Sequence, residues 1–355
     1  MEIEEYLSVD EIIIPFKGRS SLKQYNQNKP HKWGIKVFAI TSSSGILHDF
    51  EIYVGKGTVS DTNMGISDDI VVRLAEIVPE NKNYKLAFDN WSASHQLLLA
   101  LKEKRIWTCC TVRSNRMAGC VMASDESLKK VGRGTSDVKV DETNNIVCVK
   151  WFDNKSVHLM SSYAGVEPAD TVRRWSVKDK QYINVTRPVI VREYNQFMGG
   201  VDLLDMLVTL YRINLRVKRY YLRIIYHLTD ICVVNAWLLY KRHCQQMKEK
   251  PMPLVHFRLE IANALLQSGK VVKRKRGRPT NEADDFVQPP RKRAVHPAPV
   301  RNVRFDQIGH WSEHISNKQR CKLCVEAKSR IKCSKCDVAL CLHGKKNCFV
   351  QYHQK

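Results

Sequence analysis

The sequence lacks three features that would each point to a particular class of protein. No apolar run approaches the ~18–20 residues that a helix needs to span a bilayer, and the best, 231–240, is interrupted by Asn235. The first residues, MEIEE, lack the basic start of a secretory signal, so we expect neither a membrane protein nor a secreted one. Acidic residues are also few, since 36 Asp and Glu stand against 58 Lys and Arg in 355 residues, a net charge of +22. Nucleic acid is the commonest partner of such a basic chain.

The positive charge is concentrated towards the end of the chain. Residues 270–304 carry a net charge of +8 and residues 305–355 one of +6, which leaves +8 for residues 1–269. Because 270–304 is rich in proline and poor in large apolar residues, we predict a disordered basic linker there. The sequence therefore divides into a mixed-charge body, this linker and a small basic tail.

Hydrophobic periodicity predicts an α/β body with a mixed sheet in residues 1–113. We expect strands at 6–16, 34–43, 48–55, 84–88 and 106–112, and helices at 68–77 and 94–104, the latter capped by Ser94. Residues 114–190 show short β-rich runs at 136–141, 146–152 and 157–163, which indicate a β-rich insertion. Residues 191–269 are predicted to be helical, with a long helix at 220–244 whose aromatic residues belong to the core and a second helix at 257–267.

Four aspartates stand out from the other acidic residues. Asp10 interrupts a β-rich run, Asp89 ends another, and Asp202 and Asp205 lie one turn apart on a predicted helix. A carboxylate within an apolar strand costs several kcal/mol unless it is paired or binds a cation. Oxygen ligands of this kind suit Mg²⁺ or Mn²⁺, and two such ions would support phosphoryl transfer.

The tail contains six of the 12 cysteines in a pattern typical of zinc sites. Two Cys-x2-Cys pairs are followed by further cysteine and histidine residues, and eight ligands suffice for two tetrahedral Zn²⁺ ions. We predict a cross-brace in which Cys321 and Cys324 join Cys341 and His343, while Cys333 and Cys336 join Cys348 and His353. His310 or His314 is an alternative to a tail histidine. So short a segment would derive most of its folding free energy from the metal.

Basic residues interleaved with aromatic ones are candidates for DNA contact. One run follows Asp10 and contains Tyr25, His31 and Trp33, which could stack on an unpaired base; a solvated connection is the alternative. A second run follows Asp202. The predicted DNA-binding residues of the body are Lys17, Arg19, Lys29, Lys32, Arg216 and Arg219.

The linker contains KRKRGRP at 273–279, the Arg-Gly-Arg-Pro core of an AT-hook. In such a motif Arg276 and Arg278 would enter the minor groove of A·T-rich DNA, where the negative potential is strongest. The same cluster, with a second one at 291–293, also fits a nuclear localisation signal, so we expect the protein in the nucleus.

Several segments, in order along the chain, resemble the piggyBac family of transposases. They are SVDEIIIPFKGR (8–19), NKPHKWGIKVF (28–38), VGKGT (54–58), FDNW (88–91), YNQFMGGVDLLD (194–205) and the terminal cysteine cluster. The resemblance implies a ribonuclease H-like core, a catalytic triad at Asp10, Asp89 and Asp202, and a further important carboxylate at Asp205.

The same resemblance implies a metal-dependent DNA transposase that forms a homodimer, excises through hairpin ends and inserts at TTAA. The cysteine-rich domain would bind transposon-end DNA; a RING- or PHD-like domain that binds protein or a histone tail is the alternative. Family members have a substantial region ahead of the first aspartate, whereas nine residues precede Asp10 here. We therefore expect a truncated or relic gene, and the competing hypothesis is a domesticated, catalytically inactive DNA- or chromatin-binding protein.

Overall fold

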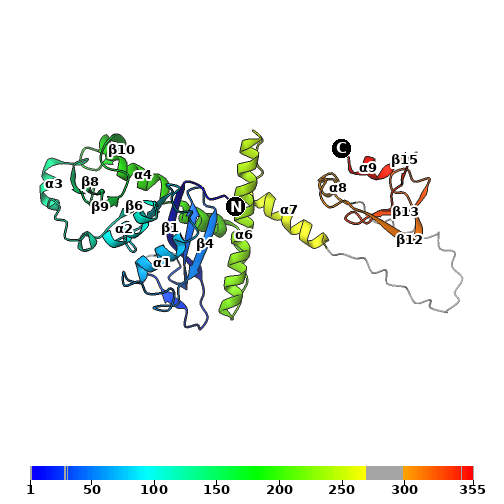
Figure 1. Cartoon of the computed structure of the whole chain (residues 1–355), viewed down its shortest axis with the longest axis horizontal. Helices are drawn as coiled ribbons and strands as arrows, with labels where there is room; N and C mark the ends of the chain where they lie inside the picture. Colours follow the sequence, from blue (N-terminus) through cyan, green and yellow to red (C-terminus); the bar gives the residue numbers. More distant parts are fainter. Residues whose placement is uncertain (1, 28, 30, 269–298, 345, 355) are drawn as a thin grey trace. The chain divides into compact units, whose positions relative to one another are not determined.

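The computed structural model describes residues 2–27, 29, 31–268, 299–344 and 346–354. The chain forms two compact units, 1–272 and 273–355, which are described separately (Figure 1). The AT-hook candidates Arg276 and Arg278, both basic clusters and most of the predicted linker lie outside the described residues.

The first unit is built on a mixed sheet, as the sequence predicts. Its core contains β1 (Tyr6–Pro15), β2 (Lys23–Tyr25), β3 (Trp33–Ser42), β4 (Leu47–Ile52), β5 (Lys85–Phe88) and β6 (Trp107–Thr111). The order is β2-β3-β1-β5-β6, with β4 also paired to β3. β1 is central because it runs antiparallel to β3 on one side and parallel to β5 on the other. The mixed α/β arrangement that the sequence predicts is confirmed.

Alternation along β1 explains why both faces of the sheet are covered. Leu7 and Val9 pack on one face against the helices α1 (Ile66–Ala75) and α2 (His95–Glu103). Ile12 packs on the other face against α5 (Gly200–Leu210) and α6 (Tyr220–Gln246). α2 begins where the sequence predicts, because the side chain of Ser94 accepts a hydrogen bond from the backbone N–H of Leu97.

The segment after β6 is rich in strands, as predicted, but it is not a sheet apart from the core. It contains η1 (Ser114–Arg116), α3 (Asp125–Val131), β7 (Ser136–Asp141), β8 (Ile146–Phe152) and β9 (Ser156–Ser161). Because β9 pairs with β6, β7 to β9 extend the same sheet to nine strands. β10 (Asp170–Ser176) and β11 (Gln181–Arg187) form a separate two-stranded sheet that the sequence analysis did not predict.

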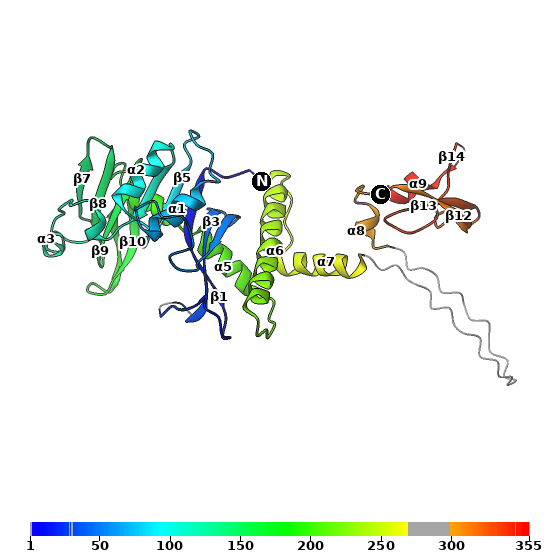
Figure 2. The same ribbon diagram turned by 60° about the horizontal axis from the view of Figure 1, so that its bottom comes forward.

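Four helices follow, where a helical segment is predicted. They are α4 (Val189–Phe197), α5, α6 and α7 (Leu254–Gln267), and α5 lies between the sheet and α6 (Figure 2). Trp237 of α6 belongs to the core, as expected, and donates a hydrogen bond from Nε1 to the carbonyl oxygen of Met252, whereas Tyr221 is exposed.

By length and composition alone, α6 is also apolar enough to cross a membrane, a test that the core helix of a soluble protein passes equally. The short run 231–240, which Asn235 interrupts, understates the apolar character of α6, because polar residues are spread thinly along the rest of the helix.

The second unit is small and begins earlier than the predicted tail. It contains α8 (Arg301–Arg304), β12 (Ser312–Arg320), β13 (Lys328–Cys333), β14 (Leu342–His343), β15 (Lys346–Asn347) and α9 (Cys348–His353). The Arg304 guanidinium lies 3.8 Å from the ring centroid of Tyr352 in α9, so residues assigned above to the linker pack on this unit. Its buried cluster consists largely of cysteines, and little other apolar area is available to stabilise it.

Candidate active site and metal centres

The fold brings together the carboxylates that the sequence singles out. Asp10 lies within β1 and Asp89 directly follows β5. The parallel register pairs Val9 with Phe88, so Asp10 and Asp89 occupy successive positions on neighbouring strands. Asp202 and Asp205 are contributed by α5, which packs on β1 and β3.

Gly200 lets α5 approach the sheet closely enough to place its carboxylates there. A Cβ atom at this position would lie 2.4 Å from the carbonyl oxygen of Ser42 and 2.7 Å from Oγ of Ser8. No side chain fits these distances, since ordinary Cβ contacts begin near 3.4 Å. The glycine at position 200 is thus explained by the close packing of the first turn of α5 on the β1–β3 pair.

The carboxylates influence one another electrostatically. The pKa of Asp10 is raised to about 7, chiefly by burial and also by the neighbouring carboxylates of Asp89 and Asp202. The hydrogen bond that the Glu11 backbone N–H donates to Asp10 opposes this rise. Burial also raises the pKa of Asp89, although the backbone N–H of Trp91 donates to its Oδ1 at 2.9 Å. The pKa of Asp205 is raised by burial and, to a smaller extent, by Asp202.

These carboxylates have the chemistry that a hard divalent cation requires. They offer oxygen ligands only, and Oδ1 of Asp205 is buried without a hydrogen-bond partner. Among the described residues, however, they do not form a group whose ligand atoms all lie within 4.8 Å of one another. These oxygen ligands fit Mg²⁺ or Mn²⁺, but they lie farther apart than the ligand atoms of a closed coordination shell.

Lys29 lies among these acidic groups. Its Nζ is 3.4 Å from Oε1 of Glu11, and Asp10 and Asp202 also raise the pKa of Lys29, against the lowering effect of burial. Lys29 therefore partly neutralises the carboxylates, whereas the sequence analysis assigned it to DNA contact. Contact of Lys29 with DNA stays a prediction.

A basic groove of about 1460 Å³ lies near the carboxylates, since its lining residues Arg212 and His31 interact electrostatically with Asp205. Its lining includes two sets of basic and aromatic residues. Lys17, Lys23, His31, Lys32 and Trp33 come from the segment between β1 and the start of β3, and Arg212, Arg216, Lys218 and Arg223 come from the segment between α5 and the first turn of α6. The groove thus unites the two basic runs that the sequence analysis identified separately, and none of its described lining residues is acidic. Arg212 and His31 lower the pKa of Asp205, which shows that the groove and the carboxylates interact.

Three of the predicted DNA-binding residues, Lys17, Lys32 and Arg216, line this groove. Arg19 and Arg219 do not belong to its lining, and Arg219 donates a hydrogen bond to the hydroxyl of Tyr221 instead.

The wall of the groove depends on Asp230, a residue that the sequence analysis missed. Asp230 is fully buried and accepts hydrogen bonds from the backbone N–H of Ile213 at 2.9 Å and from Arg258 at 2.7 Å. Arg223 donates to the carbonyl oxygen of Pro15, and so links the end of β1 to α6. An acidic residue inside the apolar helix 220–244 was the available signal, since such a residue is seldom buried unpaired.

The second unit contains two groups of four potential metal ligands. One consists of Cys321, Cys324, Cys341 and Cys348, and the other of His310, Cys333, Cys336 and His353. The ligand atoms within each group lie within 4.8 Å of one another. Two thiolates held tetrahedrally at about 2.3 Å from one Zn²⁺ would be roughly 3.8 Å apart. The Sγ atoms of Cys324 and Cys341 are 3.9 Å apart, which fits this geometry.

The pairing differs from the one expected from the sequence, although the two groups still interleave along the chain. Cys348 joins the first group and His310 the second, while His343 is exposed in β14 and belongs to neither. Cys348 and His353 were expected to share one ion. They are five residues apart on α9 and therefore project about 140° apart around the helix, so they face different groups.

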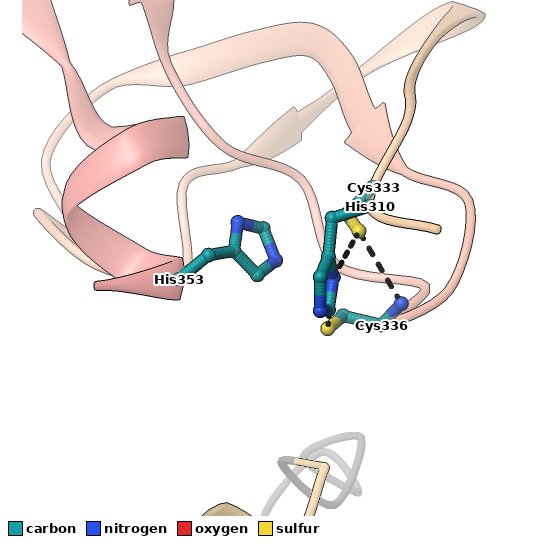
Figure 3. A group of neighbouring side chains, drawn as sticks. All are labelled: His310, Cys333, Cys336 and His353. Atoms are coloured by element: carbon teal, nitrogen blue, oxygen red, sulfur yellow. Dashed lines mark hydrogen bonds between the residues drawn. The ribbon is translucent and has the colours of Figure 1, made fainter. Parts of the chain in front are cut away.

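Both histidines are oriented as zinc ligands usually are. Nδ1 of His353 lies 2.7 Å from the carbonyl oxygen of Phe349 and donates to it, which leaves the buried Nε2 without a partner. In His310, Nε2 is 2.9 Å from a carboxylate oxygen of Asp306, and Nδ1 is 3.4 Å from Sγ of Cys333 (Figure 3). Each ring thus has one nitrogen anchored and the other directed at the ligand group.

Comparison with known proteins agrees with this arrangement. The family described as Transposase IS4 matches residues 1–237, a range that includes all four aspartates. The human PiggyBac transposable element-derived protein 3 is 33% identical over 353 residues, which are 99% of this chain and 55% of that protein. The chain belongs to the piggyBac family of transposases. The human PiggyBac transposable element-derived protein 2 is 30% identical over 354 residues, 99% of this chain and 56% of that protein.

A solved piggyBac transposase, in a synaptic complex with hairpin DNA, shares the fold with a TM-score of 0.60 and 21% identity. The alignment covers 96% of this chain and 68% of that one. The piggyBac fold assignment made from sequence motifs is therefore confirmed. The chain spans about half the length of the curated relatives that it matches.

Proposed function

We propose that this chain carries the catalytic core of a piggyBac-type DNA transposase, which cleaves and transfers DNA strands at transposon ends. The observation that carries the proposal is the convergence of Asp10, Asp89 and Asp202 from β1, β5 and α5 next to a basic groove. Asp10 and Asp89 are partly buried, and repulsion between neighbouring carboxylates of this kind is costly, so such a site is maintained where a cation or a reaction requires it.

Asp10, Asp89, Asp202 and Asp205 would hold Mg²⁺ or Mn²⁺, which supplies Lewis-acid stabilisation of the phosphate and activation of the attacking oxygen. The residues of the chain itself position the DNA. Lys32, Arg212 and Arg216 in the groove would bind backbone phosphates and hold one strand beside the carboxylates. Hydrolysis of one phosphodiester by water would free a 3′-hydroxyl, which would then attack a second phosphodiester and displace the 3′-oxygen of the cut strand. The family resemblance leads us to propose TTAA as the target.

A nicking assay tests the catalytic proposal. The full chain would be incubated with Mg²⁺ or Mn²⁺ and a labelled duplex that carries the DNA flanking the gene with TTAA at the junction. We expect strand cleavage by the chain and none by Asp10→Asn, which preserves side-chain size but removes the charge. Asp61→Asn is the matched control, because this exposed loop residue keeps its side-chain oxygen as an acceptor for the Asn63 N–H. Cleavage that persists in Asp10→Asn would rule out the proposed site.

A domesticated protein that binds DNA without cleaving it is the second candidate. Lys29 favours it, since an ammonium group among the carboxylates neutralises them without a metal. Under this proposal the groove binds DNA but the nicking assay is negative for every variant, including Lys29→Ala. Cleavage by the chain itself, dependent on Asp10, would exclude it.

We propose that the second unit is a two-zinc domain that binds DNA at the transposon end. The interleaved ligand groups and the exposed basic residues Lys318, Arg320 and Lys328 on β12 and β13 support this. Residues 299–355 should bind transposon-end duplex in a gel-shift assay with zinc present. Binding to a histone peptide but not to DNA would instead indicate a protein-binding domain.

Dimerisation and location in the nucleus also remain proposals. Relatives of this family lead us to expect a homodimer on DNA, which sedimentation with and without a transposon-end duplex would test. The basic clusters at 273–279 and 291–293 support nuclear import. A fluorescent fusion of the full chain should accumulate in the nucleus, and replacement of both clusters by alanine should abolish that accumulation.

A further inference from the structure

An aromatic pair stands exposed at the edge of the core sheet. Trp33 and Tyr25 are cross-strand neighbours in the β2–β3 pair, with ring centroids 5.0 Å apart. Their exposed fractions are 49% and 52%, which is high for large aromatic side chains. Nζ of Lys23 lies 4.8 Å from the Trp33 ring centroid, so a cation already stabilises one region of this surface.

Trp33 lines the basic groove, and it is not the only apolar group exposed there. Leu210, Tyr211 and Leu215 line the same groove, with exposed fractions of 58%, 41% and 46%. Seven lysine and arginine residues accompany them, and none of the described lining residues is acidic. The groove therefore offers both phosphate-binding charge and apolar surface.

That combination discriminates between forms of DNA. An intact duplex presents phosphates on its outside and keeps the faces of its bases stacked inside. An exposed aromatic ring therefore finds no free base face to stack on. An unpaired nucleotide presents a phosphate and a free base face together. The positive charge of the groove favours a polyanionic partner, and its exposed aromatic side chains favour a polyanion with accessible bases.

We propose that this groove binds unpaired nucleotides of DNA, with the indole of Trp33 as the stacking surface for a base. The inference rests on the proposed function, because the groove then holds the strand that is opened beside the carboxylates. The electrostatic interaction of Arg212 and His31 with Asp205 supports this placement, since both residues line the groove.

The proposal is tested by binding, without any cleavage step. Fluorescence anisotropy would compare the full chain on three DNAs of equal length in Ca²⁺: a blunt duplex, the same duplex with two unpaired bases, and a single strand. We expect Trp33→Ala to weaken binding of the two DNAs with unpaired bases by about 5- to 150-fold and to leave the blunt duplex within about twofold. Trp33→Phe should restore most of the affinity, because it keeps an aromatic face.

Trp175 provides the matched control. It is also 49% exposed and also pairs with a tyrosine, Tyr182, at a centroid distance of 5.1 Å, but it does not line the groove. Trp175→Ala should therefore behave as the unaltered chain on all three DNAs. A 2-aminopurine at the unpaired position should show fluorescence quenching that Trp33→Ala abolishes and Trp175→Ala preserves.

The outcomes separate this inference from the proposed catalysis. Binding of unpaired DNA that depends on Trp33, together with a negative nicking assay, would support the groove proposal and refute only the catalytic one. Equal loss on all three DNAs would refute stacking and assign Trp33 to general backbone contact. Equal affinity of the unaltered chain for all three DNAs would also overturn the proposal, and is the result expected if the groove binds an acidic polypeptide.

Discussion

Replacement of Gly200 by alanine tests whether close packing of α5 on the sheet creates the carboxylate site. The new methyl group would lie 2.4 Å from the Ser42 carbonyl oxygen and 2.6 Å from Oγ1 of Thr41, so α5 must move by about 1 Å to reach ordinary contact. Overpacking of this kind costs about 1–3 kcal/mol, even though alanine is the better helix former. A displacement of about 1 Å at a catalytic group reduces the rate by roughly 100-fold.

Gly199→Ala is the control, because a Cβ at this neighbouring position would meet nothing within 4 Å. Urea unfolding monitored by circular dichroism should show the loss of stability for Gly200→Ala, while Gly199→Ala stays within about 1 kcal/mol of the unaltered chain. The nicking assay should show the same contrast. Equal stability of the two variants would refute the close-packing argument, and equal nicking would refute the link from packing to the placement of Asp202.

Three further predictions concern the metal groups, the buried carboxyl and the groove. His310→Ala should reduce bound zinc in residues 299–355 from about two ions to one, measured by mass spectrometry, whereas His343→Ala should leave two; the opposite result would restore the pairing expected from sequence. Because the pKa of Asp10 is about 7 in the fold and near 3.8 otherwise, the native state binds this proton more tightly, so stability without divalent ions should fall as pH rises from about 4 to 7. Because burial also raises the pKa of Asp89 and Asp205, Asp10→Asn should reduce that fall in urea titrations without removing it, and an unchanged pH profile would show that Asp10 does not contribute. Lys32→Ala and Arg216→Ala should each reduce the slope of log K for duplex DNA against log salt by about 0.9, and an unchanged slope would exclude phosphate contact.

Those parts of the fold that have a local signature were predictable from the sequence. The strands of the core other than the short β2 follow from apolar periodicity, and the N-cap of α2 follows from Ser94; both signals are local. β12 carries no such signal, because its sequence SEHISNKQR is polar and almost wholly exposed. The extension of the core sheet by β9 was not predictable either, since the pairing of Cys109 with Ser161 joins distant parts of the chain.

The candidate sites show the same limit. The Cys-x2-Cys pairs were evident because both ligands of a pair are adjacent in sequence. His310 was only an alternative, because it precedes the first pair by a whole strand and its role depends on the fold of the unit. The groove was missed as a single feature, since Lys32 and Arg216 are brought together only by tertiary structure.

The carboxylates and the groove carry opposite charges and lie close enough to interact through Asp205. Without a balance between these charges, each site would hinder the binding proposed for the other. Acidic groups beside a DNA site repel phosphates, and here Lys29, His31 and Arg212 reduce that repulsion. DNA phosphates bound to Arg212 would compete with Asp205 for the same guanidinium, and would thereby increase the demand of the carboxylates for a cation. Because such coupling is reciprocal, a bound cation should strengthen DNA binding by the factor by which DNA strengthens cation binding. The arrangement of the residues thus favours assembly of protein, cation and DNA together over any pair of them.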